Sequence, residues 1–385
     1  MLTQNYIIMD KKHEFFRHKH ICLVGDHYNP LAIVRSLGEE GIKPIVLLCS
    51  PHPYLVQHSK YIGELHRFNT AEEGLEYLIA NYGNEALKPF IYNGSDDITL
   101  LLDTNYERLK DNFYFINGQG GLGKYLQKYD ICRLAEDCGL RIPKEELLEV
   151  GKLPTTLSYP VFTKAATSAG GGKWKDQAYI CNNEDELKAA YKNIKAKQIL
   201  VQEFVKKKNE LCIDGISING GEQVFMPYGC GYYRFIPGFY GNYMKFTPFL
   251  DKELTEKIVN VIRGAKYTGI FCIEFMVGQN DELYFLEVNF RHSGWGYAFT
   301  VGGFNLPVRW AMSTLENKII LDDFKYLDSF DAINDFSDFK DNLKLKDVSI
   351  LKWFKQYINC ECKYYYNSKD KKPFFFALLK KFHII

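Results

Sequence analysis

Short apolar runs alternate with longer amphipathic segments over the first third of the chain. The runs are flanked by turn-forming residues, and the amphipathic segments carry apolar side chains at helical spacing. Strands that alternate with helices predict a parallel sheet with crossover helices. The pattern predicts strands at 21–25, 44–49 and 90–92 and helices at 30–40 and 71–82.

The following part of the chain predicts a second and larger unit. Its last two strands flank residues 278–281, whose composition favours a β-hairpin turn. Gly139 and Pro143 end the first helix of this unit. The pattern predicts helices at 124–138 and 252–265 and strands at 159–164, 199–205, 270–277 and 283–291.

The second strand of the hairpin carries polar side chains on alternate residues. Because neighbouring side chains of a strand point to opposite faces, Glu287, Asn289 and Arg291 share one face. Leu286 and Val288 lie on the other face, which belongs in a core. A carboxylate and an amide oxygen beside a guanidinium suit a magnesium ion and the phosphates bound to it.

The first strand of the hairpin contributes a second acid to the same face. If the four turn residues set the register, Val277 pairs with Glu282 and Glu274 lies opposite Phe285. Glu274 is then one diagonal step, about 7 to 8 Å at the backbone, from Glu287. Two carboxylates converging from that distance can hold one or two cations. The alternative is a plain ion-pair network or a solvent-facing cluster.

Glycine-rich segments follow two of the predicted strands. Residues 118–123 superficially resemble a dinucleotide-binding loop, but no acidic residue ends a following strand at the usual distance, so a domain linker is favoured. Residues 168–173 follow a strand ending in Lys164, and glycine amides with lysines suit phosphate oxygens. A hairpin tip with solvated lysines is the equal alternative there, and the spacing excludes a P-loop. Lysines 206–208 favour a solvated turn.

The composition indicates a globular protein without a general affinity for nucleic acid or membranes. Hydrophobic residues make up 46% and charged residues 25% of the chain, and the formal net charge is +1. The ten cysteines lie in apolar segments without a Cys-x-x-Cys pair, so reduced core residues are expected and zinc at Cys360 and Cys362 is disfavoured. Neither a signal-peptide core nor an apolar run of membrane-spanning length is present, so a cytoplasmic location is expected.

The order and spacing of these motifs resemble the ATP-grasp superfamily, most closely its carboxylate-amine ligases and the biotin-carboxylase and carbamoyl-phosphate-synthetase branch. The resemblance runs from about residue 118 to about residue 315. It implies an α/β fold in which a Rossmann-like parallel-sheet domain precedes a two-lobed α+β ATP-grasp domain. The expected parts are a leader (1–18), the N-terminal domain (19–117), the ATP-grasp domain (118–320, with the linking helix and glycine-flap lobe at 118–205 and the metal-binding lobe at 206–320) and a C-terminal helical extension (321–385).

The resemblance also implies a role for each matching residue. Arg291 and Lys164 would stabilise the transferring phosphoryl group, and Glu274, Glu287 and Asn289 would bind one or two Mg²⁺ ions, for which Mn²⁺ can substitute. The residues expected to bind ATP are Lys128, Lys164, the flap residues Ser168, Gly170, Gly171 and Gly172, the hinge residues Gln202, Glu203 and Val205, and Glu210 as the ribose acid. Phe290 stands where many relatives have proline, and the basic flap residue Lys173 has no assigned role.

The implied chemistry is an ATP-dependent ligation. A substrate carboxylate attacks the γ-phosphate to give an acyl-phosphate and ADP, and an amine then displaces phosphate to form an amide or peptide bond. Small molecules and glycan or peptide precursors are the expected substrates, including an amino acid joined to a cell-wall precursor, and a homodimer is compatible with the sequence. The alternatives are a bicarbonate-phosphorylating, carboxylase-like enzyme and a non-catalytic ATP-binding module.

Two further parts of the chain are candidates for substrate and partner contacts. Arg234 lies in an aromatic segment, where its planar guanidinium suits either a carboxylate clamp or surface salt bridges. His292, Ser293 and Gly294 resemble the loop that borders the acceptor site. The basic and apolar tail from Lys363 loosely resembles tails of the D-aspartate-ligase-like group. A helix docked on the protein core is favoured there over a peripheral membrane contact.

Overall fold

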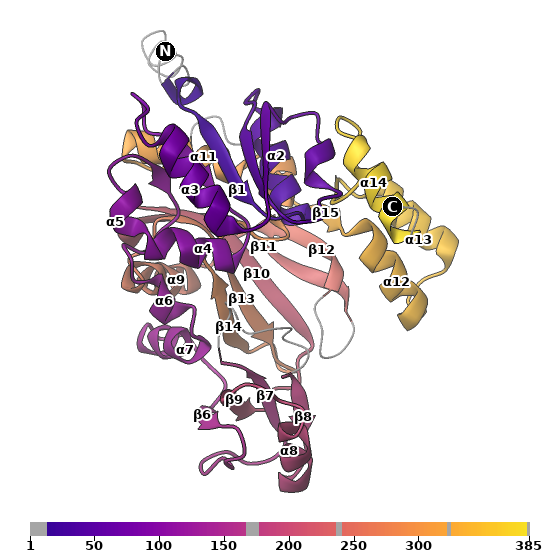
Figure 1. Ribbon diagram of the computed structural model, residues 1–385. Coiled ribbons are helices and arrows are strands. Elements are labelled where there is room, and N and C mark those ends of the chain that lie inside the picture. The colour runs from indigo at the N-terminus through magenta and orange to yellow at the C-terminus, as the bar shows by residue number, and fades with distance from the viewer. Residues whose placement is uncertain (1–13, 167–176, 236–240, 322–324, 383–385) are drawn as a thin grey trace.

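The computed structural model describes residues 14–166, 177–235, 241–321 and 325–382. These residues form an N-terminal parallel sheet, a small antiparallel lobe, and a large sheet that lies between the two (Figure 1). None of the helices among them is long and apolar enough to span a membrane.

The N-terminal domain is a five-stranded parallel sheet, which confirms the predicted fold class. Its strand order is β3-β2-β1-β4-β5. The edge strand β3 was missed because none of its side chains is fully buried, and β5 because it has only two residues. The strands are β1 (His20–Val24), β2 (Ile45–Cys49), β3 (Glu64–Phe68), β4 (Phe90–Tyr92) and β5 (Tyr114–Phe115); the helices are α2 (Tyr28–Glu39), α3 (Ala71–Tyr82), α4 (Asp96–Thr104), α5 (Tyr106–Leu109) and the 3₁₀ helix η1 (Val56–His58).

The glycine loop after β5 connects this domain to the next one. The buried carboxylate of Asp103 accepts hydrogen bonds of 2.7, 3.0 and 2.7 Å from the amides of Gly118, Gly120 and Leu122. Because an internal acid already satisfies these amides, the geometry agrees with a linker. The helix predicted at 124–138 is two helices, α6 (Leu122–Tyr125) and α7 (Lys128–Asp137), separated by Leu126 and Gln127.

The small lobe is a four-stranded antiparallel sheet with one covering helix. Its strand order is β6-β9-β7-β8, and apolar side chains of β7 and β9 pack beneath α8 in a core of their own. The elements are β6 (Glu145–Glu149), β7 (Val161–Ala165), β8 (Tyr179–Cys181), α8 (Glu184–Tyr191) and β9 (Gln198–Glu203).

The large sheet has seven strands in the order β14-β13-β10-β11-β12-β15-β16. Its three long central strands were not predicted, because glycines, cysteines and tyrosines interrupt their alternation. Its strands are β10 (Asn209–Ile218), β11 (Gln223–Phe235), β12 (Gly241–Pro248), β13 (Gly269–Val277), β14 (Leu283–Asn289), β15 (Phe330–Ile333) and β16 (Cys362–Lys363); its helices are the 3₁₀ helix η3 (Asn219–Gly221), α9 (Lys252–Gly264), α10 (Gly296–Val301) and α11 (Leu306–Glu316).

The C-terminal part of the chain is more than a helical extension. Its strands β15 and β16 continue the large sheet, and its helices α12 (Asp335–Leu345), α13 (Ile350–Asn359) and α14 (Lys372–Lys381) lie beside it (Figure 1). The tail docks on the N-terminal domain, as favoured from the sequence: the ring of Phe376 stacks on that of His58 with 3.4 Å between centroids.

The register of the acidic hairpin differs from the prediction. Val277 pairs with Leu283 instead of Glu282, and a bulge then places Glu274 directly opposite Glu287. A bulge inserts one residue into one strand, here Leu286, and shifts every later pair. The two acids are therefore cross-strand neighbours and not diagonal ones.

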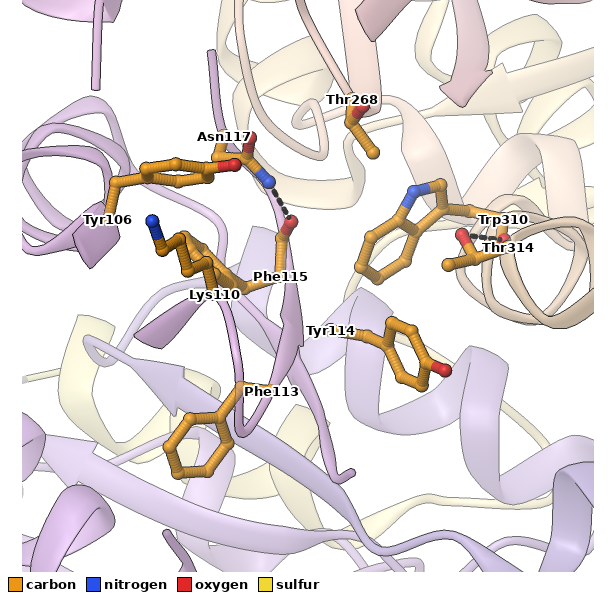
Figure 2. A pocket seen from close by; sticks show the side chains of 9 residues that line it. All are labelled: Tyr106, Lys110, Phe113, Tyr114, Phe115, Asn117, Thr268, Trp310 and Thr314. Atoms are coloured by element: carbon orange, nitrogen blue, oxygen red, sulfur yellow. Dashed lines mark hydrogen bonds between the residues drawn. The ribbon is translucent and has the colours of Figure 1, made fainter. Parts of the chain in front are cut away.

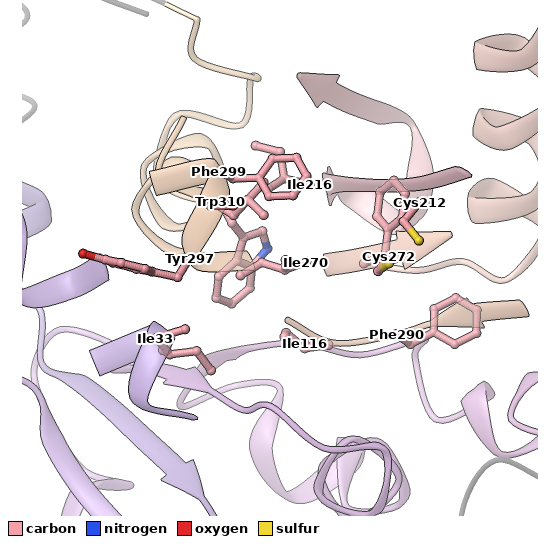
Figure 3. Close-up of a cluster of buried hydrophobic side chains, with 14 of the residues drawn as sticks. Ile33, Ile116, Cys212, Ile216, Ile270, Cys272, Phe290, Tyr297, Phe299 and Trp310 are labelled. Carbon is pink, nitrogen blue, oxygen red and sulfur yellow. The ribbon is translucent and has the colours of Figure 1, made fainter. Parts of the chain in front are cut away.

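The N-terminal domain and the large sheet share a hydrophobic core. Figure 3 shows Ile33 of α2 and Ile116 facing Ile270 and Trp310 across the boundary between the N-terminal domain and the large sheet. Trp310 of α11 lies edge-on to the rings of Phe90 and Tyr92, with centroid distances of 5.9 and 5.7 Å. Burial of this shared apolar surface stabilises the position of the N-terminal domain on the sheet.

Candidate active site

The acidic hairpin gathers oxygen ligands on one face of the large sheet. Glu274 and Glu287 lie opposite each other, and the Asn289 amide donates to Glu274 Oε1 at 3.0 Å. The neighbouring strand β10 places Cys212 opposite Glu274 and brings Glu210 to the same region. The hairpin face that was predicted to be polar is therefore polar in the structure. The neighbouring strand β10 adds further polar side chains to it.

The two opposed acids have opposite electrostatic surroundings. Lys128 Nζ lies 2.9 Å from Glu287 Oε2, and this ammonium group lowers the pKa of Glu287 to about 2. Burial, and then the charge of Glu287, raise the pKa of Glu274 well above its ordinary range. The positive charge of Arg291 opposes this rise but does not outweigh burial and the neighbouring acids. Hard oxygen ligands with unbalanced negative charge fit Mg²⁺, with Glu274, Glu287 and Asn289 as the residues that would hold it.

A second donor group overlaps this one but suits a metal less well. Ligand atoms of Glu210, Cys212 and Glu274 lie within 4.8 Å of one another, the one such group of three His, Cys, Asp or Glu side chains found among the described residues. The pKa of the Cys212 thiol is raised well above its ordinary value, by a hydrogen bond with Cys230 and by burial, so the thiol stays protonated and is a poor ligand. Glu210 instead forms an ion pair with Lys207.

Arg291 is held by an acid from the N-terminal domain. Its Nε and Nη2 lie 3.1 and 3.2 Å from the two carboxylate oxygens of Asp96, and Nη2 also donates to Asn289 Oδ1 at 2.9 Å. Asp96 is the first residue of α4, which Ser95 caps by accepting a hydrogen bond from the Ile98 amide. Sequence reasoning missed Asp96, because its only local signal is a helix N-terminus.

Two predicted phosphate lysines converge on the hairpin from different elements. Lys128 begins α7, and its amide donates to the Ala166 carbonyl just after β7 at 2.8 Å. Lys164 lies buried on β7, and its charge also helps to lower the pKa of Glu287. The predicted flap residues Ser168, Gly170, Gly171, Gly172 and Lys173 lie outside the residues that the structure describes.

The predicted hinge joins the small lobe to the large sheet. Gln202 is buried and donates to Glu145 Oε2 at 3.1 Å. Glu203 is paired with Lys144, whose amide donates to Glu203 Oε1 at 3.1 Å. Val205 is half-buried in the connection between β9 and β10, and Glu210 follows at the start of β10. The four predicted residues are thus grouped where the two units meet.

The loop after Arg291 is anchored from two sides. His292 is fully buried, with Nδ1 2.7 Å from Asn29 Oδ1, and the Ser293 hydroxyl donates to Asp214 Oδ2. Burial, and then Arg291, lower the pKa of His292 to about 3, so its imidazole is neutral at neutral pH. A Cβ at Gly294 would lie 3.1 Å from the ring of Tyr28, so this position favours glycine.

Asp214 is a further residue that sequence reasoning missed. Its side chain is completely buried on β10, Oδ1 has no hydrogen-bond partner in the structure, and burial raises its pKa to about 6. An isolated Asp in an unpredicted strand gives no sequence signal. Its place beneath Ser293 makes it part of the predicted acceptor region.

Arg234 does not have the role predicted for it. Its guanidinium is buried and donates to both carboxylate oxygens of Asp338, at 2.9 and 3.1 Å, and further to Asp347 and to Gln356 Oε1. Since four of its five N–H groups are satisfied internally, Arg234 is neither a free carboxylate clamp nor a surface salt bridge. It holds the C-terminal helices on the sheet.

A pocket of about 150 Å³ lies elsewhere, at the junction of α5, β5 and α11 (Figure 2). Tyr106, Tyr114 and Trp310 line it, and Figure 2 shows their rings around the opening. None of its lining residues belongs to the candidate site.

Comparison with known proteins defines the class. Residues 138–295 match the family model of the carbamoyl-phosphate synthase L chain, ATP binding domain, and this segment holds β6 to β14 with the acidic hairpin. For this part of the chain the match agrees with the ATP-grasp resemblance inferred from the sequence.

Particular relatives share parts of the sequence. N5-carboxyaminoimidazole ribonucleotide synthase of Staphylococcus aureus (strain COL) is 27% identical over 153 residues, 38% of this chain and 38% of the relative's length. Biotin carboxylase 2 of Bacillus subtilis (strain 168) is 26% identical over 295 residues, 68% of this chain and 63% of that protein. The chain thus matches well under half of the first relative and less than two thirds of the second.

Solved structures extend the likeness to most of the fold. N5-carboxyaminoimidazole synthetase from Staphylococcus aureus, complexed with ADP, superposes with a TM-score of 0.67 over 88% of this chain and 86% of its own, at 16% identity. An L-amino acid ligase from Bacillus licheniformis gives 0.61 over 82% and 80%, at 13% identity. At these identities the structures establish the shared fold and nothing finer.

Proposed function

We propose that this protein is an ATP-dependent, ADP-forming ligase that activates a carboxylate as an acyl-phosphate and joins it to an amine. The convergence of Lys128, Glu274, Glu287 and Arg291 at one end of the large sheet carries this proposal. The roles of the individual residues and the division of the chain at 117 and 320 belong to it.

The charges of the site suit phosphoryl transfer. A carboxylate oxygen of the substrate would bond to the γ-phosphorus while the bond to the bridging oxygen of ADP breaks, so negative charge must be held at three oxygens. Lys128 and Lys164 place two ammonium groups at the hairpin, and Arg291 adds a guanidinium oriented by Asp96. Bound Mg²⁺ would offset the charge on the phosphoryl oxygens.

The second half of the reaction would take place beside the loop after Arg291. The amine attacks the acyl carbon, phosphate leaves with the oxygen it accepted, and the amine loses a proton. The pKa of His292 is lowered to about 3, so its imidazole is neutral and adds no positive charge beside Arg291. The pKa of Asp214, at about 6, leaves its carboxyl group mostly ionised at neutral pH next to Ser293. The likeness to an amino acid ligase favours an amino acid among the substrates, and we include its attachment to a glycan or cell-wall precursor in the proposal.

Phosphate release tests this function. The full chain is supplied with MgATP and with pairs of carboxylates and amines, from amino acids to sugar-linked acids, and ADP and phosphate are measured. We expect release that requires both partners of a pair and that Glu287→Gln lowers at least a hundredfold, because the carboxylate that pairs with Lys128 is lost. Glu256→Gln, on the exposed face of α9, is the matched control. Full turnover by Glu287→Gln would rule the mechanism out.

A bicarbonate-phosphorylating enzyme is the second candidate. It is favoured by the sequence similarity to a biotin carboxylase and to an N5-carboxyaminoimidazole ribonucleotide synthase. The same assay separates the two: ADP release that needs bicarbonate and no organic carboxylate supports the second candidate. ATP binding without turnover under any condition supports a non-catalytic module. A cytoplasmic location and a homodimer remain predictions.

A further inference from the structure

The turn between β1 and α2 places His27 beside the loop that follows Arg291. Asn29, two residues later, donates from Nδ2 to the His292 carbonyl at 2.6 Å, and Arg291 Nη1 donates to the same oxygen at 3.5 Å. The Arg291 guanidinium and the first turn of α2 therefore meet at one carbonyl oxygen. His27 is the N-cap of that turn, and it is an exposed residue, while Arg291 is half-buried.

The segment that carries His27 is fixed on both sides. Before it, the Asp26 carboxylate accepts hydrogen bonds of 2.6 to 3.2 Å from the backbone amides of residues 54–56. After it, the ring of Tyr28 lies 3.9 Å from that of His27, measured between centroids, and lies against Gly294 of the loop. A segment held in this way keeps the imidazole in a defined position, as a group that acts on a reacting atom requires.

The hydrogen bonds of His27 indicate which ring nitrogen carries the proton. The Asn29 amide donates to Nδ1 at 3.5 Å, so Nδ1 supplies a lone pair and the proton of the neutral ring is on Nε2. Nε2 has no hydrogen-bond partner among the residues that the structure describes. The exposed imidazole therefore offers an unused N–H donor beside Arg291.

The imidazole of His27 is neutral at neutral pH. Partial burial of the ring, and then the charge of Arg291, lower the pKa of His27 to about 4, and the charge of Asp26 opposes this more weakly. The N-terminus of α2 also disfavours a positive charge at its cap. A neutral imidazole at a helix N-terminus can polarise a carbonyl group by donating a hydrogen bond, without giving up its proton.

We propose that His27 is a further catalytic residue, whose Nε2–H donates a hydrogen bond to the acyl oxygen while the amine attacks the acyl-phosphate. This inference rests on the proposed ligase function. The nitrogen lone pair forms the bond to the acyl carbon, and the π electrons of the carbonyl move to its oxygen. Nε2–H and Arg291 stabilise the negative charge on that oxygen.

The second part of this step leaves the imidazole unchanged. The electron pair on the oxygen re-forms the carbonyl while the bond between the acyl carbon and the phosphate oxygen breaks. The departing phosphate takes the proton that the nitrogen loses. His27 therefore keeps its own proton and acts only as a hydrogen-bond donor.

The alternative is a histidine that only caps α2, and His27→Asn separates the two roles. Asparagine is among the best N-cap residues, so this variant keeps the cap and loses Nε2–H. Both half-reactions are measured on the full chain with MgATP. Positional isotope exchange in ATP labelled with heavy oxygen at the β,γ-bridge reports acyl-phosphate formation, and mass spectrometry of the amide product reports attack by the amine. The probes are amino acids in both roles, with glucuronate as a further carboxylate.

We expect the two half-reactions to respond differently. His27→Asn should lower the rate of amide formation by a factor of about 10² to 10³, the usual effect of losing one oxyanion donor, while isotope exchange and the melting temperature stay near those of wild type. His27→Gln, whose side-chain amide nitrogen can take the place of Nε2, should recover part of the loss. His52→Asn, at an exposed histidine of the same domain, is the matched control and should behave as wild type.

The outcomes distinguish this inference from the proposed function. Amide formation by His27→Asn at the wild-type rate, or equal losses in both half-reactions, would overturn the role of His27 and leave the ligase proposal standing. No isotope exchange by wild type with any of these carboxylates would refute the ligase proposal, and this inference with it. Nitrogen NMR of histidine-labelled protein is an independent measurement: a proton on Nδ1 of His27 instead of Nε2 would also overturn the role.

Discussion

At the scale of single residues, the site depends on a few buried groups whose charge states are set by their neighbours. Glu287 is held ionised by Lys128, while Glu274, on the opposite strand, is biased toward its protonated form by burial and by Glu287. The pair therefore offers one permanent and one conditional negative charge. A divalent cation bound between the two acids would stabilise the ionised form of Glu274. Cation binding is therefore expected to release a proton from Glu274.

Asp214 gives a residue-scale prediction about pH. Its pKa rises from the ordinary 3.8 to about 6, so the folded chain keeps this proton in a range where the unfolded chain has lost it. Stability therefore falls as pH rises through that range, by about 3 kcal/mol for a shift of about two units. We expect Asp214→Asn to remove this loss, because an amide oxygen can still accept from Ser293.

Urea unfolding of wild type and Asp214→Asn between pH 4 and pH 7 measures the difference directly. The two curves should diverge as pH rises and then run parallel above the folded-state pKa. Asp137→Asn, an exposed acid on α7, is the comparison variant and should follow the wild type. Parallel curves for wild type and Asp214→Asn throughout the range would contradict the assignment.

Arg291 gives a second prediction at this scale. Its contacts with both oxygens of Asp96 need a planar fork, which lysine lacks. Arg291→Lys should leave the melting temperature within a few degrees and lower the rate of ADP release by a factor of about 10² to 10³, typical of a lost charge-stabilising donor. Arg263→Lys on the exposed part of α9 is the control. An unchanged rate of ADP release for Arg291→Lys would show that Arg291 does not take part in the reaction.

At the scale of elements, the bulge in β14 and the helices α12 and α13 have the largest effects. The bulge at Leu286 brings Glu287 directly opposite Glu274, so its extra residue determines which acids can share a cation. The C-terminal helices are fastened by the buried ion pair of Arg234 on β11 with Asp338 on α12. A residue that looked like a substrate contact is thus a link between elements.

Substitution of Arg234 tests this link. Arg234→Met leaves the carboxylate of Asp338 buried without its cation, and loss of one partner of a buried pair costs about 3 to 5 kcal/mol. We expect chemical denaturation to show a loss of that size, while ATP affinity measured below the transition stays within about twofold of wild type. Arg263→Met should cost well under 1 kcal/mol. A large loss of ATP affinity in folded Arg234→Met protein would show that Arg234 contributes to the candidate site.

At the scale of the whole molecule, the N-terminal domain contributes residues to the candidate site. The C-terminal tail binds to the same domain. Asp96 orients Arg291, and Asn29 donates to the His292 carbonyl at 2.6 Å. On its other side, Arg35 of α2 forms a buried ion pair with Asp370 of the tail, whose carboxylate also accepts from Ser59. The described parts of the chain therefore form one connected structure.

A double-mutant cycle at Arg35 and Asp370 tests this ion pair between the N-terminal domain and the tail. Arg35→Met and Asp370→Leu should each cost about 3 to 5 kcal/mol, and the double variant should cost clearly less than their sum, because neither charge is then left buried alone. Equilibrium unfolding monitored by tryptophan fluorescence measures all four forms. Additive losses would show that the two residues act independently.

Much of this architecture follows from local pattern. The strands β1, β2 and β4, the helix α3 and both hairpin strands are predicted within a residue or two, because buried strands and amphipathic helices have strong periodicities. The order of Lys128, Lys164, Glu274, Glu287, Asn289 and Arg291 could also be read from the chain, and the family match supports the class. The central strands β10 to β12 gave no such signal, so Asp214 and Cys212 were missed.

By itself, the sequence determined the fold class and which residue types lie at alternate positions of the acidic hairpin, since alternation is a property of the backbone. Only the tertiary structure decided which of them meet. The bulge in β14 places Glu287 directly opposite Glu274. The packing of the N-terminal domain on the large sheet places Asp96 beside Arg291. The guanidinium of Arg234 is buried and forms an ion pair with Asp338. Contacts between residues far apart in the chain depend on packing and desolvation, which a linear pattern does not encode residue by residue.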